Sequence, residues 1–378
     1  MPLRIAALLI SAFVLLAASD LSKGVEAYKR GDFKEALHLY RKAAEAGSAR
    51  AMVNLGLMYR YNIGVEKSLA KAKELFAEAA RKGYPRAMVE LGILYEEGLG
   101  TERNATKAFE LYEKGARKGY PRAMRRLAGL YETGTGTAQD PQKALLWYKK
   151  AAEKGDLKAQ TALGALYDRG LGTKESPETA LYWWRKAAKR GSAEAHNALG
   201  YLYIRGRGVP KDPQKGLEHF LEAARKGLPQ AMHNTAFLYE EGLGVARSCP
   251  KALQWYAKAA DAGYTPSMVS LALLYMKGSC TPKRPEKAID LLRRAAEADD
   301  PAAPSILGRI YEEGDGVKQD FAEAAFWYQK GAALGQPQSL YNLGLLYYNG
   351  LGVQKDPVRA RLLMEEAKRR GLKIPGSL

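Results

Sequence analysis

The sequence contains few side-chain groupings that could carry out catalysis. Two Ser-x-x-Lys tetrapeptides occur, beginning at Ser68 and Ser248, and this motif can mark the acylated serine of penicillin-recognising enzymes. The Ser-Asp-Asn and Lys-Thr-Gly motifs that accompany it in those enzymes are absent from the chain. Asp or Asn replaces both serines at equivalent places further along the chain, as expected of residues that cap helices. We therefore expect the two serines to be helix caps.

The histidines and acidic pairs do not form a recognisable site either. None of the four histidines shows His-x-x-x-His spacing, and only His196 and His233 leave a shared metal site as an open alternative. Paired carboxylates such as Glu96 and Glu97 precede a glycine and are expected to be solvated. We predict no catalytic, cofactor-binding or metal-binding residues, and we do not expect an enzyme.

The remaining distinctive groups are basic and aromatic. The formal net charge is +18, with 59 Lys and Arg against 41 Asp and Glu, which favours an acidic protein, an anionic surface, a polysaccharide or nucleic acid as partner. The alternative is a merely soluble surface, because the basic residues are spread along the whole chain. The 23 tyrosines could stack on nucleic-acid bases if they were exposed. Their exposure depends on the elements that position them.

The first nineteen residues differ from the rest of the chain. Arg4 precedes an apolar run from Ile5 to Leu16, and the small residues Ala17, Ala18 and Ser19 follow. This pattern predicts a secretory signal peptide over 1–19, cleaved before Asp20. The apolar run is shorter than the roughly 20 residues of a membrane span; an uncleaved anchor is the alternative. We expect an exported protein, either periplasmic or secreted, with at most a contact to an anionic membrane surface.

Step by step from Ala51, the chain repeats itself every 36 residues. Numbering each repeat in columns from Ala51, column 5 is Leu in eight of nine repeats, column 6 is Gly or Ala, and column 9 is always Tyr. Columns 1, 5, 8 and 9 are apolar or aromatic, which is the spacing of one helical face. The tyrosines therefore belong to an apolar stripe, so we expect core packing, and nucleic acid is not an expected partner.

Each repeat reads as two helices. A glycine pair such as Gly98 and Gly100 stops the first helix. Column 18 holds an N-cap type in eight of nine repeats, Arg284 being the exception, and proline often follows it. An apolar stripe then follows, and a glycine such as Gly155 ends the second helix. Such a hairpin can bury its apolar side only against its neighbours.

The sequence thus predicts an all-α fold, an α/α superhelical solenoid of about nine helix–turn–helix repeats with an N-terminal capping hairpin. The signal peptide covers 1–19, the tetratricopeptide-like cap covers 20–50, and a tail covers 375–378. The nine repeats, together 51–374, cover 51–86, 87–122, 123–158, 159–194, 195–230, 231–266, 267–302, 303–338 and 339–374.

The repeat resembles the Sel-one-like repeat family, a relative of tetratricopeptide repeats. The resemblance rests on Ala-x-x-x-Leu-Gly-x-x-Tyr, as at Ala195–Tyr203, and on Lys-Ala-x-x-Trp-Tyr-x-x-Ala-Ala-x-x-Gly, as at Lys143–Gly155. It implies a right-handed superhelix and a role as adaptor or scaffold in the bacterial envelope or in host-directed secretion. Thr235, Cys280 and Asp299 depart from the pattern, and the last two predict a kink in repeat seven.

The two cysteines of the chain could pair in an oxidising compartment. Cys249 falls at the start of a second helix and Cys280 in the loop of the next repeat. Packed helices lie about 10 Å apart, whereas a disulfide needs Cα atoms within about 7 Å. A disulfide and two free thiols both remain open.

Columns 3, 4, 7, 10 and 11 of the first helix vary freely between repeats and should point away from the core. Exposed Tyr, Phe and Arg in these columns are types enriched at binding hot spots. The candidate partner-binding residues are Arg125, Arg126, Asn197, Tyr201, His233, Phe237, Arg309, Tyr341 and Tyr348. The alternatives are a merely tolerant surface and, in column 7, packing of Tyr201 and Phe237 on the next repeat.

We therefore expect a non-catalytic scaffold that binds a protein segment, acidic or extended, along a preformed basic groove. Replacing Arg125 and Arg126 by Glu should weaken partner recovery without lowering the melting temperature. An envelope enzyme acting on cell-wall or β-lactam substrates is one alternative, because some members of the resembling family carry such names. A binder of polyanions or anionic surfaces is the other, and its binding should weaken steeply with salt.

Overall fold

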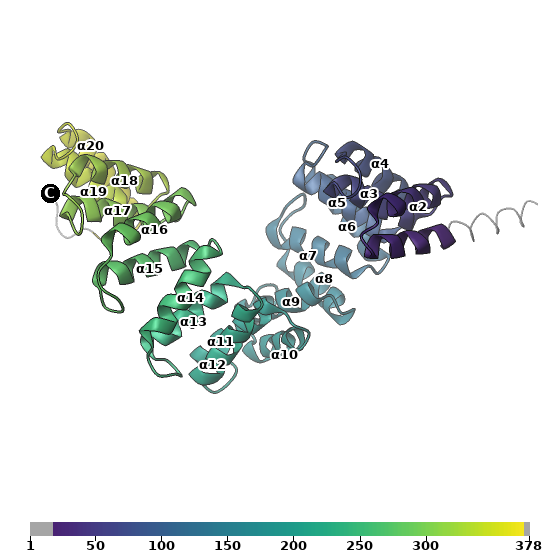
Figure 1. Cartoon of the computed structure of the whole chain (residues 1–378), viewed down its shortest axis with the longest axis horizontal. Coiled ribbons are helices and arrows are strands. Elements are labelled where there is room, and N and C mark those ends of the chain that lie inside the picture. The colour runs from purple at the N-terminus through teal and green to yellow at the C-terminus, as the bar shows by residue number, and fades with distance from the viewer. Residues whose placement is uncertain (1–17, 374–378) are drawn as a thin grey trace, which may run out of the picture. The chain divides into compact units, whose positions relative to one another are not determined.

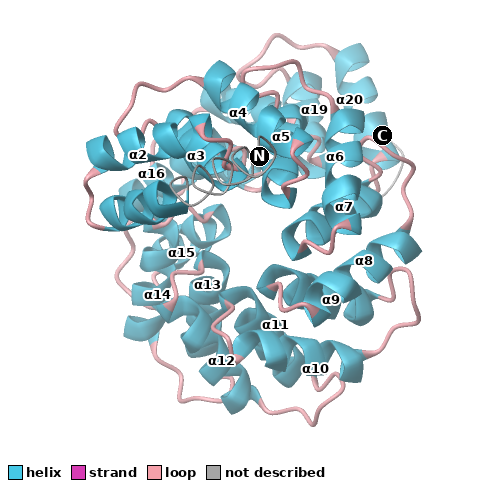
Figure 2. Ribbon diagram, turned by 90° about the vertical axis from the view of Figure 1, so that its right-hand side faces the viewer, coloured by secondary structure: helices cyan, strands magenta, loops and turns pink. Residues whose placement is uncertain are grey.

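The computed structural model describes residues 18–373, which are α-helical and contain no β-strand (Figures 1 and 2). The chain divides into two compact units, Met1–Ser192 (unit 1) and Ala193–Leu378 (unit 2). The candidate signal peptide, apart from its last two residues, and the C-terminal tail lie outside the described residues. Within 18–373, no helix combines the length and the apolar character needed to cross a membrane.

Successive helices pack as antiparallel pairs, which confirms the predicted all-α repeat solenoid. In unit 1 a helix at 18–29 comes first. It is followed by α2 (Phe33–Glu45), α3 (Ala49–Tyr61), α4 (Leu69–Arg81), α5 (Pro85–Glu97), α6 (Ala105–Arg117), α7 (Pro121–Thr133), α8 (Pro141–Glu153), α9 (Leu157–Arg169) and α10 (Pro177–Ala188). From α3 onward, odd-numbered helices are the first helices of the repeats and even-numbered helices are the second.

Unit 2 continues the same alternation with repeats five to nine. Its helices are α11 (Ala193–Arg205), α12 (Pro213–Arg225), α13 (Pro229–Glu241), α14 (Cys249–Asp261), α15 (Thr265–Lys277), α16 (Pro285–Glu297), α17 (Ala303–Glu313), α18 (Phe321–Ala333), α19 (Pro337–Asn349) and α20 (Pro357–Arg369).

The helix ends follow the sequence signals closely. First helices end at a left-handed residue, usually glycine as at Gly98 and once asparagine, Asn62 with φ 59°. The column 18 side chain accepts a hydrogen bond from a first-turn amide of the second helix in seven repeats. Ser248 is an exception to our prediction, because it occupies the N-cap position without a side-chain hydrogen bond.

Within each unit, the core lies between the two helices of a repeat and the next hairpin. Columns 5 and 8 are buried in every repeat, and the column 9 tyrosines are buried or half-buried, which confirms their assignment to the core. The small residue in column 6 faces the large side chain in column 26 of the second helix. At Gly164 an added Cβ would lie 2.5 Å from the Trp184 indole nitrogen. The missing side chain therefore sets how closely the two helices approach.

Where repeats six and seven depart from the repeat sequence pattern, the structure changes only locally. Thr235 is buried, and its hydroxyl donates to the carbonyl oxygen of Ala231 at 2.8 Å. Asp299 takes the left-handed conformation that glycine holds elsewhere, with φ 57°. Asp300 then accepts hydrogen bonds from the amides of Ala302 and Ala303, where α17 begins. The change at repeat seven is thus a shorter first helix in the repeat that follows it.

Candidate functional site

The first helices present one side that the core does not use. Its residues belong to columns 3, 4, 7 and 10, and we call this surface the first-helix face. From repeat three onward, the column 3, 4 and 7 side chains are half-buried or exposed, whereas columns 5 and 8 stay buried. All nine candidate partner-binding residues lie on this face, in α7, α11, α13, α17 and α19. Their column positions in the sequence predicted that they share this face, whereas the contacts they make are known only from the structure.

Column 10 supplies a glutamate that accepts a hydrogen bond from a buried tyrosine hydroxyl of the same repeat. The pairs are Tyr112–Glu96 at 2.6 Å, Tyr148–Glu132 at 2.9 Å, Tyr256–Glu240 at 2.8 Å and Tyr328–Glu312 at 2.5 Å. Burial and the adjacent carboxylate raise the pKa of each tyrosine far above its usual value. Glu96 and Glu240 are therefore helix-joining groups, which corrects the expectation of a solvated carboxylate pair.

In unit 1 a buried carboxylate joins three first helices. Glu90 is only 2% exposed and pairs with Arg60 of α3 at 3.2 Å and with Arg122 of α7 at 2.6 Å. Removing one partner of a buried ion pair is strongly destabilising, because the other charge stays buried. This cluster is consequently part of the framework of unit 1.

Arg125 and Arg126 also form ion pairs between helices. Arg125 lies 3.1 Å from Asp156, the N-cap of α9, and Arg126 lies 3.4 Å from Glu96 of α5. Both arginines line a pocket of about 480 Å³ together with Lys158. Because they link neighbouring repeats, we now expect their replacement by glutamate to lower stability as well as binding, contrary to the expectation from the sequence.

In unit 2 the structure brings two of the candidate residues together through a third. The Asn234 side-chain amide donates to the Asn197 oxygen at 2.9 Å, and the Tyr201 hydroxyl donates to the Asn234 oxygen at 2.9 Å. Phe237, one turn after His233 on α13, is 45% exposed. The result is a surface of amide and aromatic groups on α11 and α13.

His233 is held inside the same part of the face. Its Nδ1 lies 2.9 Å from the Ser267 hydroxyl, and its ring packs edge-on against Tyr256 and Tyr264. Burial lowers the pKa of His233. The neutral imidazole is thus favoured, which makes His233 a hydrogen-bonding and packing residue of the face.

Three candidate residues lie apart from these groups. Arg309 on α17 and Tyr348 on α19 are exposed, and Tyr341 on α19 is half-buried. Within residues 18–373, no hydrogen bond or ion pair connects Arg309 with either tyrosine. They extend the first-helix face but do not form a shared site with it.

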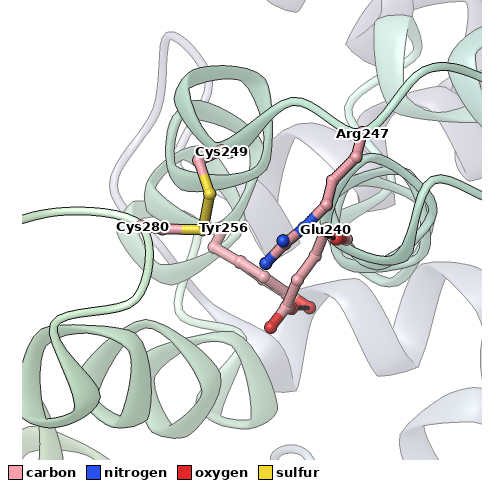
Figure 3. The surroundings of a disulfide bond; sticks show 5 residues. All are labelled: Glu240, Arg247, Cys249, Tyr256 and Cys280. Carbon is pink, nitrogen blue, oxygen red and sulfur yellow. Dashed lines mark hydrogen bonds between the residues drawn. A yellow bond between two sulfur atoms is a disulfide. The ribbon is translucent and has the colours of Figure 1, made fainter.

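The two cysteines form a disulfide with a Cα–Cα distance of 5.0 Å. Cys249 begins α14, and Cys280 lies in the loop after α15 (Figure 3). In other repeats this loop position is a glycine packed against the first residues of the preceding second helix, as at Gly136, where a Cβ would lie 2.4 Å from the Ala105 carbonyl. The bridge replaces that close contact between repeats six and seven.

The groups first considered for catalysis occupy structural positions. Ser68 caps α4 by accepting the Lys71 amide hydrogen at 3.3 Å. His196 lies beside His219, with 3.1 Å between the Nδ1 atoms. Across the part of the chain that the structure describes, no three or more His, Cys, Asp or Glu side chains gather as a metal site.

Sequence reasoning missed the residues that complete the face. Asn234 was one of many polar residues in column 4, and Glu90 gave no sign of burial, because their partners are 30 to 37 residues away in the sequence. The Tyr–Glu pairs did leave a signal. Column 10 is glutamate only in the four repeats whose column 26 is tyrosine, and this covariation between repeats would have indicated the contact.

Comparison with known proteins gives a consistent result for the whole chain. A family model described as the Sel1 repeat matches residues 17–48, 49–84, 85–120, 121–156, 157–192, 193–228, 229–264, 265–300, 305–336 and 337–372. A search of curated proteins finds no match. The matched segments cover nearly all of the described residues, including the region predicted as a cap.

Two solved structures are similar over most of the chain. One is c5321, a protective antigen of uropathogenic Escherichia coli with an SLR fold, at 28% identity, TM-score 0.62, covering 89% of this chain and 80% of that chain. The other is a Sel1 repeat protein of Oxalobacter formigenes, at 30% identity, TM-score 0.57, covering 79% of this chain and 86% of that chain.

Proposed function

The chain belongs to the Sel1 repeat family, and from this premise we propose that it is an exported, non-catalytic scaffold that binds another protein along the first-helix face. Sel1 repeat proteins are generally protein-interaction scaffolds. One observation carries the proposal for this chain. Columns 5 and 8 are buried in all nine repeats, while columns 3, 4 and 7 reach the surface from repeat three onward and differ in type from repeat to repeat.

The surface on α11 and α13 supports binding of an extended protein segment. Tyr201 and Phe237 are 42% and 45% exposed, and exposed aromatic side chains are typical anchors at interfaces. The amides of Asn197 and Asn234 lie beside them and can exchange hydrogen bonds with a peptide backbone. A surface held by its own hydrogen bonds loses little entropy when a partner binds.

Export is supported by the sequence pattern of 1–19 and by the disulfide, since disulfides persist mainly in oxidising compartments. We place the mature protein in the periplasm or outside the cell. Sequencing the N-terminus of the protein recovered from the periplasm or medium should give Asp20. Recovery of the intact chain starting at Met1, in the cytoplasm, would contradict this part of the proposal.

The proposal is tested by crosslinking in the native envelope, purification of the protein and mass spectrometry of what it captures. Changing both Tyr201 and Phe237 to Ala should abolish recovery of the partner, because the change removes the aromatic anchors. A matched control changes Tyr182 and Phe326 to Ala, two similarly exposed aromatic residues on second helices. Equal recovery with both double variants would remove the first-helix face as the binding surface.

The enzyme alternative has a direct test of its own. Purified protein should not hydrolyse a chromogenic β-lactam or solubilised cell-wall fragments, because Ser68 is engaged as a helix cap. Lys251, the base that the motif at Ser248 would supply, has its ammonium group over the Tyr239 ring, 4.9 Å from the centroid. Turnover that disappears when Ser68 or Ser248 is replaced by Ala would refute the non-catalytic assignment.

A further inference from the structure

A basic residue recurs at the second position of the first helix in each repeat of unit 1. It is Arg50 in α3, Arg86 in α5, Arg122 in α7 and Lys158 in α9, and we call these four residues the basic row. In the 36-residue register of unit 2, the same position holds Glu194, Gln230, Pro266, Ala302 and Gln338. The row is thus a property of unit 1 alone.

Helix stability does not explain the basic row. The first turn of a helix carries partial positive charge, so a cation there is unfavourable and an anion is favourable. The first turns of α3, α5, α7 and α9 contain no acidic residue to offset the row. In α11 the same position is the acidic Glu194, as helix electrostatics favours. Arg122 is explained by its ion pair with the buried Glu90, and the other three cations at unfavourable positions call for another role.

Three members of the row have no ion-pair partner among the described residues. Arg122 pairs with the buried Glu90 at 2.6 Å. No carboxylate within residues 18–373 forms an ion pair with Arg50, Arg86 or Lys158. Arg50 and Lys158 are exposed and Arg86 is half-buried. Their charges are available to a partner.

Two pockets open beside the row. Arg50 and Arg86 line one of about 290 Å³ together with Lys29, Tyr28 and Tyr40, and none of its described lining residues is acidic. Burial raises the pKa of Tyr40, and Arg50 and Arg86 lie near enough to oppose that rise.

Lys158 lines the second pocket, of about 480 Å³, with Arg125 and Arg126. This pocket also contains Glu96 and Glu132, but each accepts a hydrogen bond from a buried tyrosine. Basic side chains therefore border cavities near both ends of the row.

The spacing of the row fits an extended chain. The first helix α5 contacts both α3 and α7, and packed helices lie about 8–10 Å apart. A polyproline II segment advances about 3.1 Å per residue with three residues per turn, so every third side chain projects on one side about 9 Å further along. One acidic residue in three would then meet one basic residue per repeat.

We propose that the basic row binds an acidic segment of a partner protein that lies across unit 1 in an extended, polyproline-like conformation, with a carboxylate at every third residue. This inference rests on the proposed scaffold function and names the chemistry of its partner. The anchoring cavity is the pocket of Arg50, Arg86 and Lys29, where a carboxylate would meet cations without a competing acid.

The first test compares two peptide probes on the mature full-length protein. One contains four Glu-Pro-Pro triplets; the other has the same composition with its glutamates in one block. The triplet peptide should bind more tightly, and its affinity should fall as salt screens the ion pairs. Equal affinity of the two peptides would overturn the predicted spacing.

The second test removes the unpaired charges. Replacing Arg50, Arg86 and Lys158 by Ala should weaken binding of the triplet peptide about tenfold, the combined effect of three ion pairs at the protein surface. Arg122 is left intact because it supports Glu90. The matched control replaces Arg81, Lys114 and Lys149, exposed on second helices, and should change affinity less than about twofold. Unchanged binding in the first variant refutes the site.

A heparin probe separates the acidic peptide from a polyanion. If heparin binding is lost when the basic row is replaced, while neither peptide binds, the partner is a polysaccharide and the inference is wrong. The proposed scaffold function has a separate outcome. If the peptides fail but partner capture still depends on Tyr201 and Phe237, the scaffold function stands without this site.

Discussion

At the scale of single residues, the contact between columns 6 and 26 decides how tightly each hairpin closes. At Gly164 the Trp184 indole nitrogen lies 2.5 Å from the place of an added Cβ, and it donates a hydrogen bond to the Thr161 carbonyl at 3.0 Å. No repeat combines alanine in column 6 with tryptophan in column 26. A methyl group here should displace the indole and break that hydrogen bond.

Gly164→Ala is expected to lower the free energy of unfolding by about 1–3 kcal/mol through overpacking. The control is Gly129→Ala, in a first helix where the nearest atom to an added Cβ is the Tyr148 hydroxyl at 3.5 Å. That change should be neutral or raise the free energy of unfolding by up to about 1 kcal/mol, since alanine favours helix. Chemical denaturation of both variants distinguishes them; equal effects would show that column 6 does not limit packing.

The buried Tyr–Glu pairs predict sensitivity to alkali. Burial raises the folded-state pKa of Tyr112, Tyr148, Tyr256 and Tyr328, whereas an unfolded tyrosine titrates near about 10. The unfolded state therefore loses protons first, and stability that is complete below about pH 10 falls as pH rises further, by roughly 1 kcal/mol per pair at about pH 11.

Melting temperatures measured from neutral to alkaline pH check this expectation. Tyr256→Phe combined with Glu240→Ile, which reproduces the Phe220 and Ile204 pair of repeat five, should reduce the alkaline loss by the share of one pair. A melting temperature that stays constant through this pH range would contradict the assignment of buried, protonated tyrosines.

At the scale of elements, the sequence predicted the helices, their caps and their stops well, because these depend on neighbouring residues. The first helices end where the glycine pairs indicated, and seven of the nine column 18 residues cap as their type suggests. The expected spacing between helix axes could not decide between a disulfide and two free thiols. The structure shows that the loop residue Cys280 approaches the start of α14 more closely than those axes lie, with 5.0 Å between Cα atoms.

Reduction of the Cys249–Cys280 bridge should destabilise repeats six and seven. The closed loop has a sequence separation of 31 residues, for which loop entropy predicts a loss of about 4 kcal/mol. Hydrogen exchange in α14 to α16 should become faster after reduction or in the Cys249→Ser and Cys280→Ser double variant. The same reductant applied to the double variant is the control and should have no further effect. Unchanged exchange in these helices would mean that the bridge adds no stability.

At the scale of the whole molecule, periodicity made the fold predictable and left the surface unpredictable. The pattern of buried residues recurs every 36 residues, so the core positions of one hairpin predict those of the other hairpins. Ion pairs such as Arg60–Glu90 instead join side chains in different repeats, and each occurs once. Only atomic positions could reveal which of the basic residues are neutralised, and hence that Arg125 and Arg126 are held by partners while Arg50 and Arg86 are not.

Stability in such an array should be local. Leu307 is fully buried in repeat eight, and Leu307→Ala should lower stability by about 2–5 kcal/mol. Because each hairpin stabilises only its neighbours, faster hydrogen exchange should centre on α17 and diminish toward α11. Leu127→Ala, at the same column of repeat three, is the matched variant and should show the same profile centred on α7. A uniform increase along the chain in either variant would contradict local coupling.

The bridge between α14 and the loop after α15 also has a mechanical consequence. A chain of hairpins held at its two ends and stretched should lengthen one hairpin at a time, because few contacts connect distant repeats. The disulfide withholds the loop that it closes, with its sequence separation of 31, from that lengthening; this is about 100 Å of fully extended chain. Under tension, the redox state of the surroundings would therefore set the maximum length to which this chain can be extended.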